Sequence, residues 1–201
     1  MRARLIAKRS RFAAGGALKT WIALLRGVNV LGRRKLPMRD LSAILERAGF
    51  RSVRTYIQSG NVVFQASRGS ARALSARIEQ LILRSSGFRP RVLVLSAEAL
   101  ADAIGGNPFP AATRDHKSLH LFFLSEHPSQ PDLASLRRLK SRTEAFALQQ
   151  GVFYLHTPRG FSRSTIREKI ERHLGVHATA RNWRTVNRLR EMSDQRVPRS
   201  C

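Results

Sequence analysis

The segment VRTYIQSGNVVFQA, residues 53–66, indicates two antiparallel strands joined by a tight turn. The runs 53–58 and 62–66 are rich in β-branched and aromatic residues, which favour strands. Between them lies Ser-Gly-Asn at 59–61, where Gly60 can take the positive φ that a hairpin turn needs. The segment therefore predicts a β-hairpin.

The segments around this hairpin predict a βαββαβ order. A buried strand is expected at 20–25, and a helix that starts at Pro37 and ends before Gly49 follows it. After the hairpin, the apolar spacing predicts a helix at 71–83 and a strand at 92–96. This order is the ferredoxin-like arrangement.

The rest of the chain repeats the order more loosely. The expected elements are a helix at 97–104 between the halves, a strand at 119–124, a helix at 132–140, a hairpin of 144–149 and 152–156, and helices at 165–174 and 183–192. Thr165 and Glu168 have the spacing of a capping box at the start of one helix. We expect an α+β fold of two packed ferredoxin-like halves, a pseudo-duplication. Its parts are a basic leader at 1–19, halves at 20–106 and 107–192, and a tail at 193–201.

Composition limits the class of protein. A chain of 201 residues with 42% hydrophobic residues is long and apolar enough to bury a core. It has no apolar run near the ~20 residues that cross a bilayer, so we expect no membrane partner. The single cysteine, Cys201, allows neither an internal disulfide nor a cysteine zinc site. We expect a soluble cytoplasmic protein without a metal or cofactor.

The charge is strongly positive. Lysine and arginine total 37 against 13 acidic residues, a formal net charge of +24, which attracts phosphates. A GC-rich genome would explain arginine in place of lysine but not the few carboxylates. No acidic residue precedes Asp40, and the leader is interpreted as a disordered basic arm or as the product of an upstream start codon.

The loop after the first strand is a candidate anion site. Its glycines are spaced as in a phosphate-binding loop, but Arg33 and Arg34 stand where such a loop has Lys-Ser/Thr, which argues against a nucleoside triphosphatase. Together with Arg26 and Lys35 they form a cationic bend before a helix N-terminus, which suits an anion. The alternative is a solvated basic turn.

The hairpin is a second candidate. Alternation places three polar or aromatic side chains on one face: Arg54, Tyr56 and Gln58. An aromatic residue on a polar sheet face is typical of RNA-binding sheets, although those carry several aromatics. The alternative is that this face packs against the second half.

The segment 181–183 opens the last predicted helix. Asn182 suits the N-cap position. Trp183 would either anchor the helix in the core or stack on a ligand. Arg181 is the candidate for a functional role.

Four motifs carry a resemblance to a known family: LLRGVNV at 24–30, KLPM at 35–38, TYIQSGNVVF at 55–64 and TARNWRTV at 179–186. The chain resembles the bacterial family of domain of unknown function 1697 over about residues 20–192. The resemblance implies two ferredoxin-like halves and no particular activity. The chain departs from the family pattern at Leu31, usually glycine, and at Arg34, often asparagine.

These observations define the expected site, in which the cationic bend and the hairpin share one exposed neighbourhood. Its binding residues are Arg26, Asn29, Arg33, Lys35, Tyr56, Gln58, Ser59, Asn61 and Arg181. The first hypothesis is a non-catalytic protein that binds nucleic acid (RNA or single strands) or another polyanion. The alternatives are an enzyme or sensor for a small anionic metabolite, using the Arg26–Lys35 loop, and a purely structural or assembly role.

Overall fold

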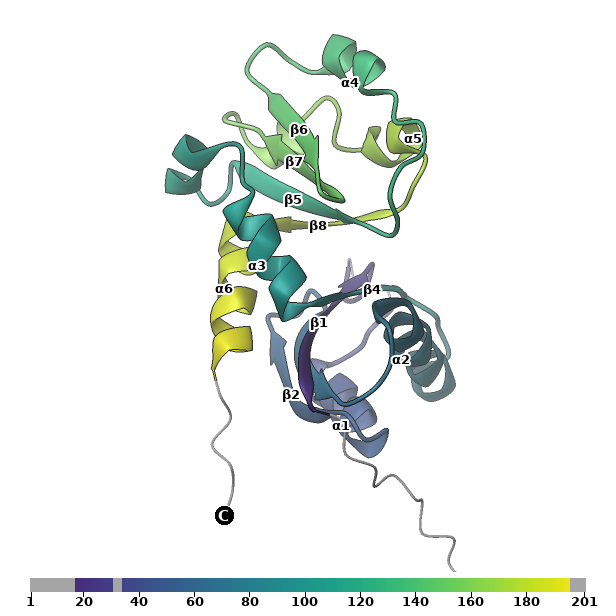
Figure 1. Cartoon of the computed structure of the whole chain (residues 1–201). Coiled ribbons are helices and arrows are strands. Elements are labelled where there is room, and N and C mark those ends of the chain that lie inside the picture. Colours follow the sequence, from purple (N-terminus) through teal and green to yellow (C-terminus); the bar gives the residue numbers. More distant parts are fainter. Residues whose placement is uncertain (1–16, 31–33, 196–201) are drawn as a thin grey trace, which may run out of the picture.

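The computed structural model describes residues 17–30 and 34–195, which form two lobes, each with a four-stranded antiparallel sheet (Figure 1). The predicted α+β fold of two ferredoxin-like halves is confirmed. Most of the predicted leader and tail, at 1–16 and 196–201, lies outside the described residues, as does Arg33.

The first sheet has the strand order β2-β3-β1-β4. Its strands are β1 (Lys19–Arg26), β2 (Arg51–Tyr56), β3 (Asn61–Ala66) and β4 (Arg91–Ser96). Helices α1 (Met38–Arg47) and α2 (Ala71–Ser86) cover one face, where Leu41 and Ile78 pack with Phe64 in a buried apolar core. The hairpin is confirmed, but its first strand ends at Tyr56, so Gln58 lies in the turn.

The second sheet has the equivalent order β6-β7-β5-β8. Its strands are β5 (Leu119–Leu124), β6 (Ala145–Gln149), β7 (Val152–His156) and β8 (Ala178–Asn182). The 3-10 helix η1 (Pro110–Arg114) precedes β5, and η2 (Phe161–Arg163) lies between β7 and β8 in the chain. Helices α4 (Leu133–Leu139) and α5 (Ile170–Leu174) contribute Leu136 and Ile170 to the core on one face. Strand β8 was not expected from the sequence.

The helix expected at 165–174 begins only at Ile170, and the capping-box prediction at Thr165 is wrong. The Thr165 N–H donates to Oε1 of Glu144 at 3.2 Å, and the Thr165 hydroxyl lies 2.8 Å from Oε2 of the same carboxylate. Glu144 is only 5% exposed and needs donors, because a buried carboxylate without them is costly. Thr165 therefore supplies hydrogen bonds to the Glu144 carboxylate and does not cap a helix.

The two halves pack through the sheet faces that their own helices leave open. Ile22 and Leu24 of the first sheet and Leu121 and Tyr154 of the second belong to one buried cluster. Helices α3 (Ala97–Gly105) and α6 (Trp183–Asp194) lie side by side at this junction (Figure 1).

Tyr56 and Trp183 both pack against the cluster between the halves. Arg54, on the same strand as Tyr56, donates to Oε1 of Gln195 at 2.9 Å and to the carbonyl of Met192. The polar face of the hairpin is therefore covered, as in the packing alternative, and Trp183 is a core anchor. A ligand site has to be sought at the ends of the strands.

Candidate functional site

Asn29 fastens the bend after β1 to the hairpin turn. Its Nδ2 donates to the carbonyls of Leu36 and Gln58, both at 2.9 Å, and its Oδ1 accepts the Leu36 N–H at 2.8 Å. The Asn29 side chain thus supplies hydrogen bonds to backbone groups of both loops. The backbone of Asn29 has a φ of +54, a conformation that asparagine tolerates. The role of Asn29 is to hold the two loops together.

The hairpin turn is fixed by Asn61 and Gly60. Asn61 is fully buried and its Nδ2 donates to the Tyr56 carbonyl at 3.1 Å and to the Ser59 hydroxyl at 2.9 Å. Gly60 has φ +74, and a Cβ there would lie 2.6 Å from Cβ of Leu25. The turn therefore presses against the end of β1, so closely that only glycine fits.

Arg181 reaches from β8 of the second half into this corner of the first half. Its Nη2 donates to the Leu25 carbonyl at 2.8 Å and the Ser59 carbonyl at 3.2 Å, and its Nε donates to Oδ1 of Asn61. Burial lowers the pKa of the guanidinium to about 10, so the side chain stays charged at neutral pH. Arg181 is a clamp between the halves.

The structure brings Asn29, Gln58, Ser59, Asn61 and Arg181 into contact at one corner, but not all of them on an exposed surface. Asn29, Asn61 and Arg181 use their polar atoms for internal contacts, and Tyr56 faces the core between the halves. Among the members of the set that the structure describes, those exposed to solvent are Arg26, Lys35, Gln58 and Ser59. These exposed residues beside the clamp are therefore the members of the set that a ligand could contact.

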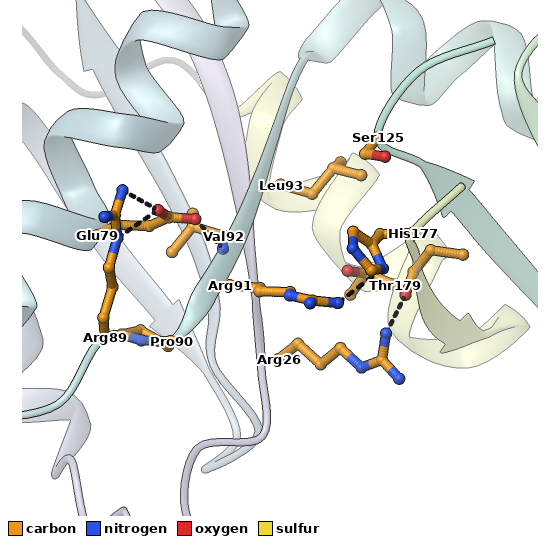
Figure 2. Close-up of a pocket in the computed structure, with 11 residues that line it drawn as sticks. Arg26, Glu79, Arg89, Pro90, Arg91, Val92, Leu93, Ser125, His177 and Thr179 are labelled. Atoms are coloured by element: carbon orange, nitrogen blue, oxygen red, sulfur yellow. Dashed lines mark hydrogen bonds and ion pairs between the residues drawn. The ribbon is translucent and has the colours of Figure 1, made fainter. Parts of the chain in front are cut away.

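Arg26 lines a cleft of about 460 Å³ between the two halves (Figure 2). The first half contributes residues from the start of β4 and from α2, and the second half contributes the start of β8 and the loop before it. The lining residues are Arg26, Glu79, Arg89, Pro90, Arg91, Val92, Leu93, Ser125, His177, Ala178 and Thr179. The cleft thus combines cationic groups with an apolar wall.

Two of its arginines lie directly opposite each other. Arg26 ends β1 and Arg91 begins β4, and the two are paired in the antiparallel register. Like charges in this position are destabilising unless an anion lies nearby. Figure 2 shows both side chains extended from the first half toward His177 and β8 of the second.

One carboxylate partly neutralises this pair. Glu171 of α5 accepts from Nη1 of Arg26 and from the Ala178 N–H, the latter at 2.7 Å. Burial raises the pKa of Glu171, but the hydrogen bonds from Arg26 and the Ala178 N–H and the charge of Arg26 outweigh it, so the pKa lies below its ordinary value. Glu171 therefore remains ionised at neutral pH and forms an ion pair with Arg26.

Arg91 has a different partner. Its Nη1 lies 2.7 Å from Nδ1 of His177. Because a guanidinium can only donate, the imidazole must accept through an unprotonated Nδ1. Arg91 thus enters the cleft with its positive charge opposite a ring nitrogen rather than a carboxylate.

The edge of β4 beside the cleft is closed to strand addition at two positions. The N–H of Val92 donates to Oε1 of Glu79 at 3.0 Å, and the N–H of Val94 donates to the Ser75 hydroxyl at 3.1 Å. Glu79 also holds Arg89 at 2.9 Å. Side chains of the cleft, rather than a free sheet edge, are therefore the groups that can contact a ligand.

Sequence reasoning missed Arg91, His177 and Glu171. Arg91 could have been found as a charge at the start of the strand expected at 92–96, but its position opposite Arg26 depends on the register. Glu171 and His177 lie far along the chain, beside a strand that the sequence did not predict. Among the residues that the structure describes, no cluster of three or more His, Cys, Asp or Glu could hold a metal.

Together these features define a two-half α+β protein with a cationic cleft between its halves. A family model described as "Protein of unknown function (DUF1697)" matches residues 18–154, and the chain belongs to this family. The matched region contains the bend and the hairpin but ends before Arg181.

A solved structure has the same fold. The conserved bacterial protein SP0830 from Streptococcus pneumoniae superposes with a TM-score of 0.68 at 24% identity, covering 89% of this chain and all of the other. No curated protein matches this chain. None of the helices in the described ranges is both long and apolar enough to span a membrane.

Proposed function

We propose that this protein binds single-stranded nucleic acid, with backbone phosphates held by the arginines of the cleft between the halves. The observation that carries the proposal is the cross-strand pair Arg26–Arg91 at a cleft, in a chain of formal net charge +24. A bound phosphate would add to the partial neutralisation of the pair by Glu171 and accept hydrogen bonds from both guanidinium groups.

The surroundings of the pair favour an extended polyanion. Arg34 and Lys35 are exposed, and a Cβ on Gly27 would lie 3.4 Å from Nη1 of Arg34, so that guanidinium is close to the end of β1. Cations therefore continue from the cleft along this end of the sheet. Positive grooves of this kind follow the backbone of a single strand.

The cleft suits one nucleotide of an unpaired strand. Pro90, Leu93 and Ala178 give it an apolar wall beside the cations. A base or sugar can contact this wall while its phosphate meets the arginines. The covered sheet faces remove the usual stacking surface of RNA-binding sheets, so binding is expected to depend mainly on phosphate contacts and on salt.

The test is a fluorescence-anisotropy titration of labelled single-stranded RNA of about twelve nucleotides, a typical site size. Arg91→Ala is compared with Arg137→Ala, which removes an exposed arginine from α4 in the other half. Both variants lose one positive charge, so long-range attraction falls equally. We expect Arg91→Ala to weaken binding about tenfold, as for a lost charge-assisted hydrogen bond, and Arg137→Ala to change it little. No binding of the unmodified protein at low salt, or equal weakening by the two variants, would overturn the proposal.

A second candidate function, binding of a small anionic metabolite, is favoured by the cleft volume. About 460 Å³ falls within the ~300–1,000 Å³ of small-molecule sites. A small anion that fits should raise the melting temperature and displace the RNA. Inorganic pyrophosphate and a mononucleotide are tested in a thermal-shift series and as competitors in the RNA titration. If neither compound raises the melting temperature or displaces the RNA, the small-metabolite function is rejected.

A further inference from the structure

Two exposed apolar side chains lie on the loops that meet at the end of β1. In the described ranges four large apolar residues are exposed, and two of these are Val30, 53% exposed, and Ile57, 52% exposed. The hydrogen bond from Asn29 to the Gln58 carbonyl joins the residues next to each of them. We call Val30 and Ile57 the apolar tip.

The backbone of Ile57 is strained. Its φ of +48 lies in the left-handed region, where a β-branched residue is a clear outlier. Asparagine or glycine would adopt this conformation more easily. Because the side chain is half exposed, its burial does little to offset the strain. Strain of this kind is typical of ligand-contacting positions.

The tip lies at the same end of the first sheet as the arginines of the cleft. In the order β2-β3-β1-β4, the turn that carries Ile57 joins β2 and β3, Arg26 ends β1, and Arg91 begins β4. Neighbouring strands are ~4.8 Å apart, so the turn is roughly 10–14 Å from Arg91. A stacked single strand advances ~3.4 Å per nucleotide, so this span corresponds to about three or four nucleotides.

We propose that the apolar tip contacts bases of the same strand whose phosphates the cleft arginines hold; this inference rests on the proposed function. Apolar side chains are known to press against base faces or wedge between them. The exposed cations Arg34 and Lys35, on the same loop as Val30, favour an anionic occupant over a second copy of this basic chain. The strand would then run from the cleft, past the end of β1, to the hairpin turn.

The test separates base contacts from phosphate contacts. Two labelled oligonucleotides of equal length are used, one with normal bases and one in which the central residues are abasic. Both carry the same phosphates. Ile57→Asn removes the apolar side chain and keeps a residue that tolerates the backbone conformation, and Leu139→Asn, at an exposed apolar position on α4, is the matched control.

We expect the unmodified protein to bind the normal oligonucleotide about threefold to tenfold more tightly than the abasic one, a gain typical of base contacts. Ile57→Asn should lose most of this difference without weakening abasic binding, while Leu139→Asn keeps it. A melting temperature of Ile57→Asn at or above that of the unmodified protein shows that the variant is folded.

Two outcomes overturn the inference while leaving the proposed function intact. One is an unchanged preference for bases in Ile57→Asn. The other is equal weakening of both oligonucleotides by this variant. The proposed function itself fails instead if the unmodified protein binds neither oligonucleotide, or if Arg91→Ala and Arg137→Ala weaken binding equally.

Discussion

Arg181→Ala tests whether this side chain joins the two halves as the structure indicates. The Leu25 carbonyl and Oδ1 of the fully buried Asn61 would lose their charged donor. The carbonyls of Gly60 and Ala180 would lose a donor as well, but the Gly60 carbonyl keeps the hydrogen bond from the Leu25 N–H, and Ala180 is only half-buried. The Ser59 carbonyl would lose one too, but Ser59 is exposed and water can replace the donor. The expected loss in the free energy of unfolding is therefore calculated for the Leu25 carbonyl oxygen and the Asn61 Oδ1 alone.

An unsatisfied buried polar group costs about 1–3 kcal/mol, so the two together give about 2–6 kcal/mol, with about 4 kcal/mol as the central value. For a chain of this size, 1 kcal/mol shifts the melting temperature by roughly 2–4 °C. Arg181→Ala should therefore melt ~8–16 °C lower. Arg181→Lys should recover part of this loss, because an ammonium can reach one or two acceptors but lacks the planar fork.

The assay is denaturant unfolding followed by the fluorescence of Trp21, in the first core, and of Trp183, at the junction of the halves. Arg184→Ala, at an exposed position three residues further on, is the control and should change the free energy of unfolding by no more than about 0.5 kcal/mol. If Arg181→Ala and Arg184→Ala differ by less than about 1 kcal/mol, the interpretation of Arg181 as a clamp is wrong.

Two further predictions concern the same corner and the cleft beside it. Gly60→Ala should lose about 2–4 kcal/mol of unfolding free energy, because its Cβ would lie 2.6 Å from Cβ of Leu25 at a φ of +74. The control is Gly175→Ala, which has a similar φ of +71 but no atom within 4 Å of the added Cβ, and it should lose only about 1 kcal/mol. Equal losses in the two variants would contradict the packing argument. Because the pKa of Glu171 is lowered in the fold, its contribution to stability is complete above the ordinary carboxyl pKa of about 4.3 and is lost as the pH falls through the lower folded value. In a series of denaturation curves at decreasing pH, the free energy of unfolding of Glu171→Gln should therefore fall less steeply than that of the unmodified protein. The same decrease in both proteins would refute the ion pair with Arg26.

Local sequence patterns predicted the strands and helices that have strong periodicity. The hairpin around Gly60 and the helix that begins after Pro37 follow from turn chemistry and apolar spacing. Strand β8 was missed because its sequence, Ala-Thr-Ala-Arg-Asn, alternates small and polar residues and has little strand preference of its own. It is a strand because β5 supplies its hydrogen bonds.

The site was predicted in part for a related reason. The motif residues Asn29 and Asn61 do gather at one corner, but the sequence could not show that their polar atoms are used within the fold. The cleft depends on contacts such as that between Arg26 and Glu171, which are 145 residues apart. Such pairs follow from the packing of the two halves and leave no local pattern.

The salt dependence of RNA binding tests the central claim most directly. For single strands, each phosphate contact contributes about 0.7 to the slope of log K against log salt. The account predicts that Arg91→Ala reduces the magnitude of this slope by about 0.7 relative to the unmodified protein, whereas Arg137→Ala leaves it unchanged. Equal slopes for Arg91→Ala and the unmodified protein would contradict a phosphate contact in the cleft.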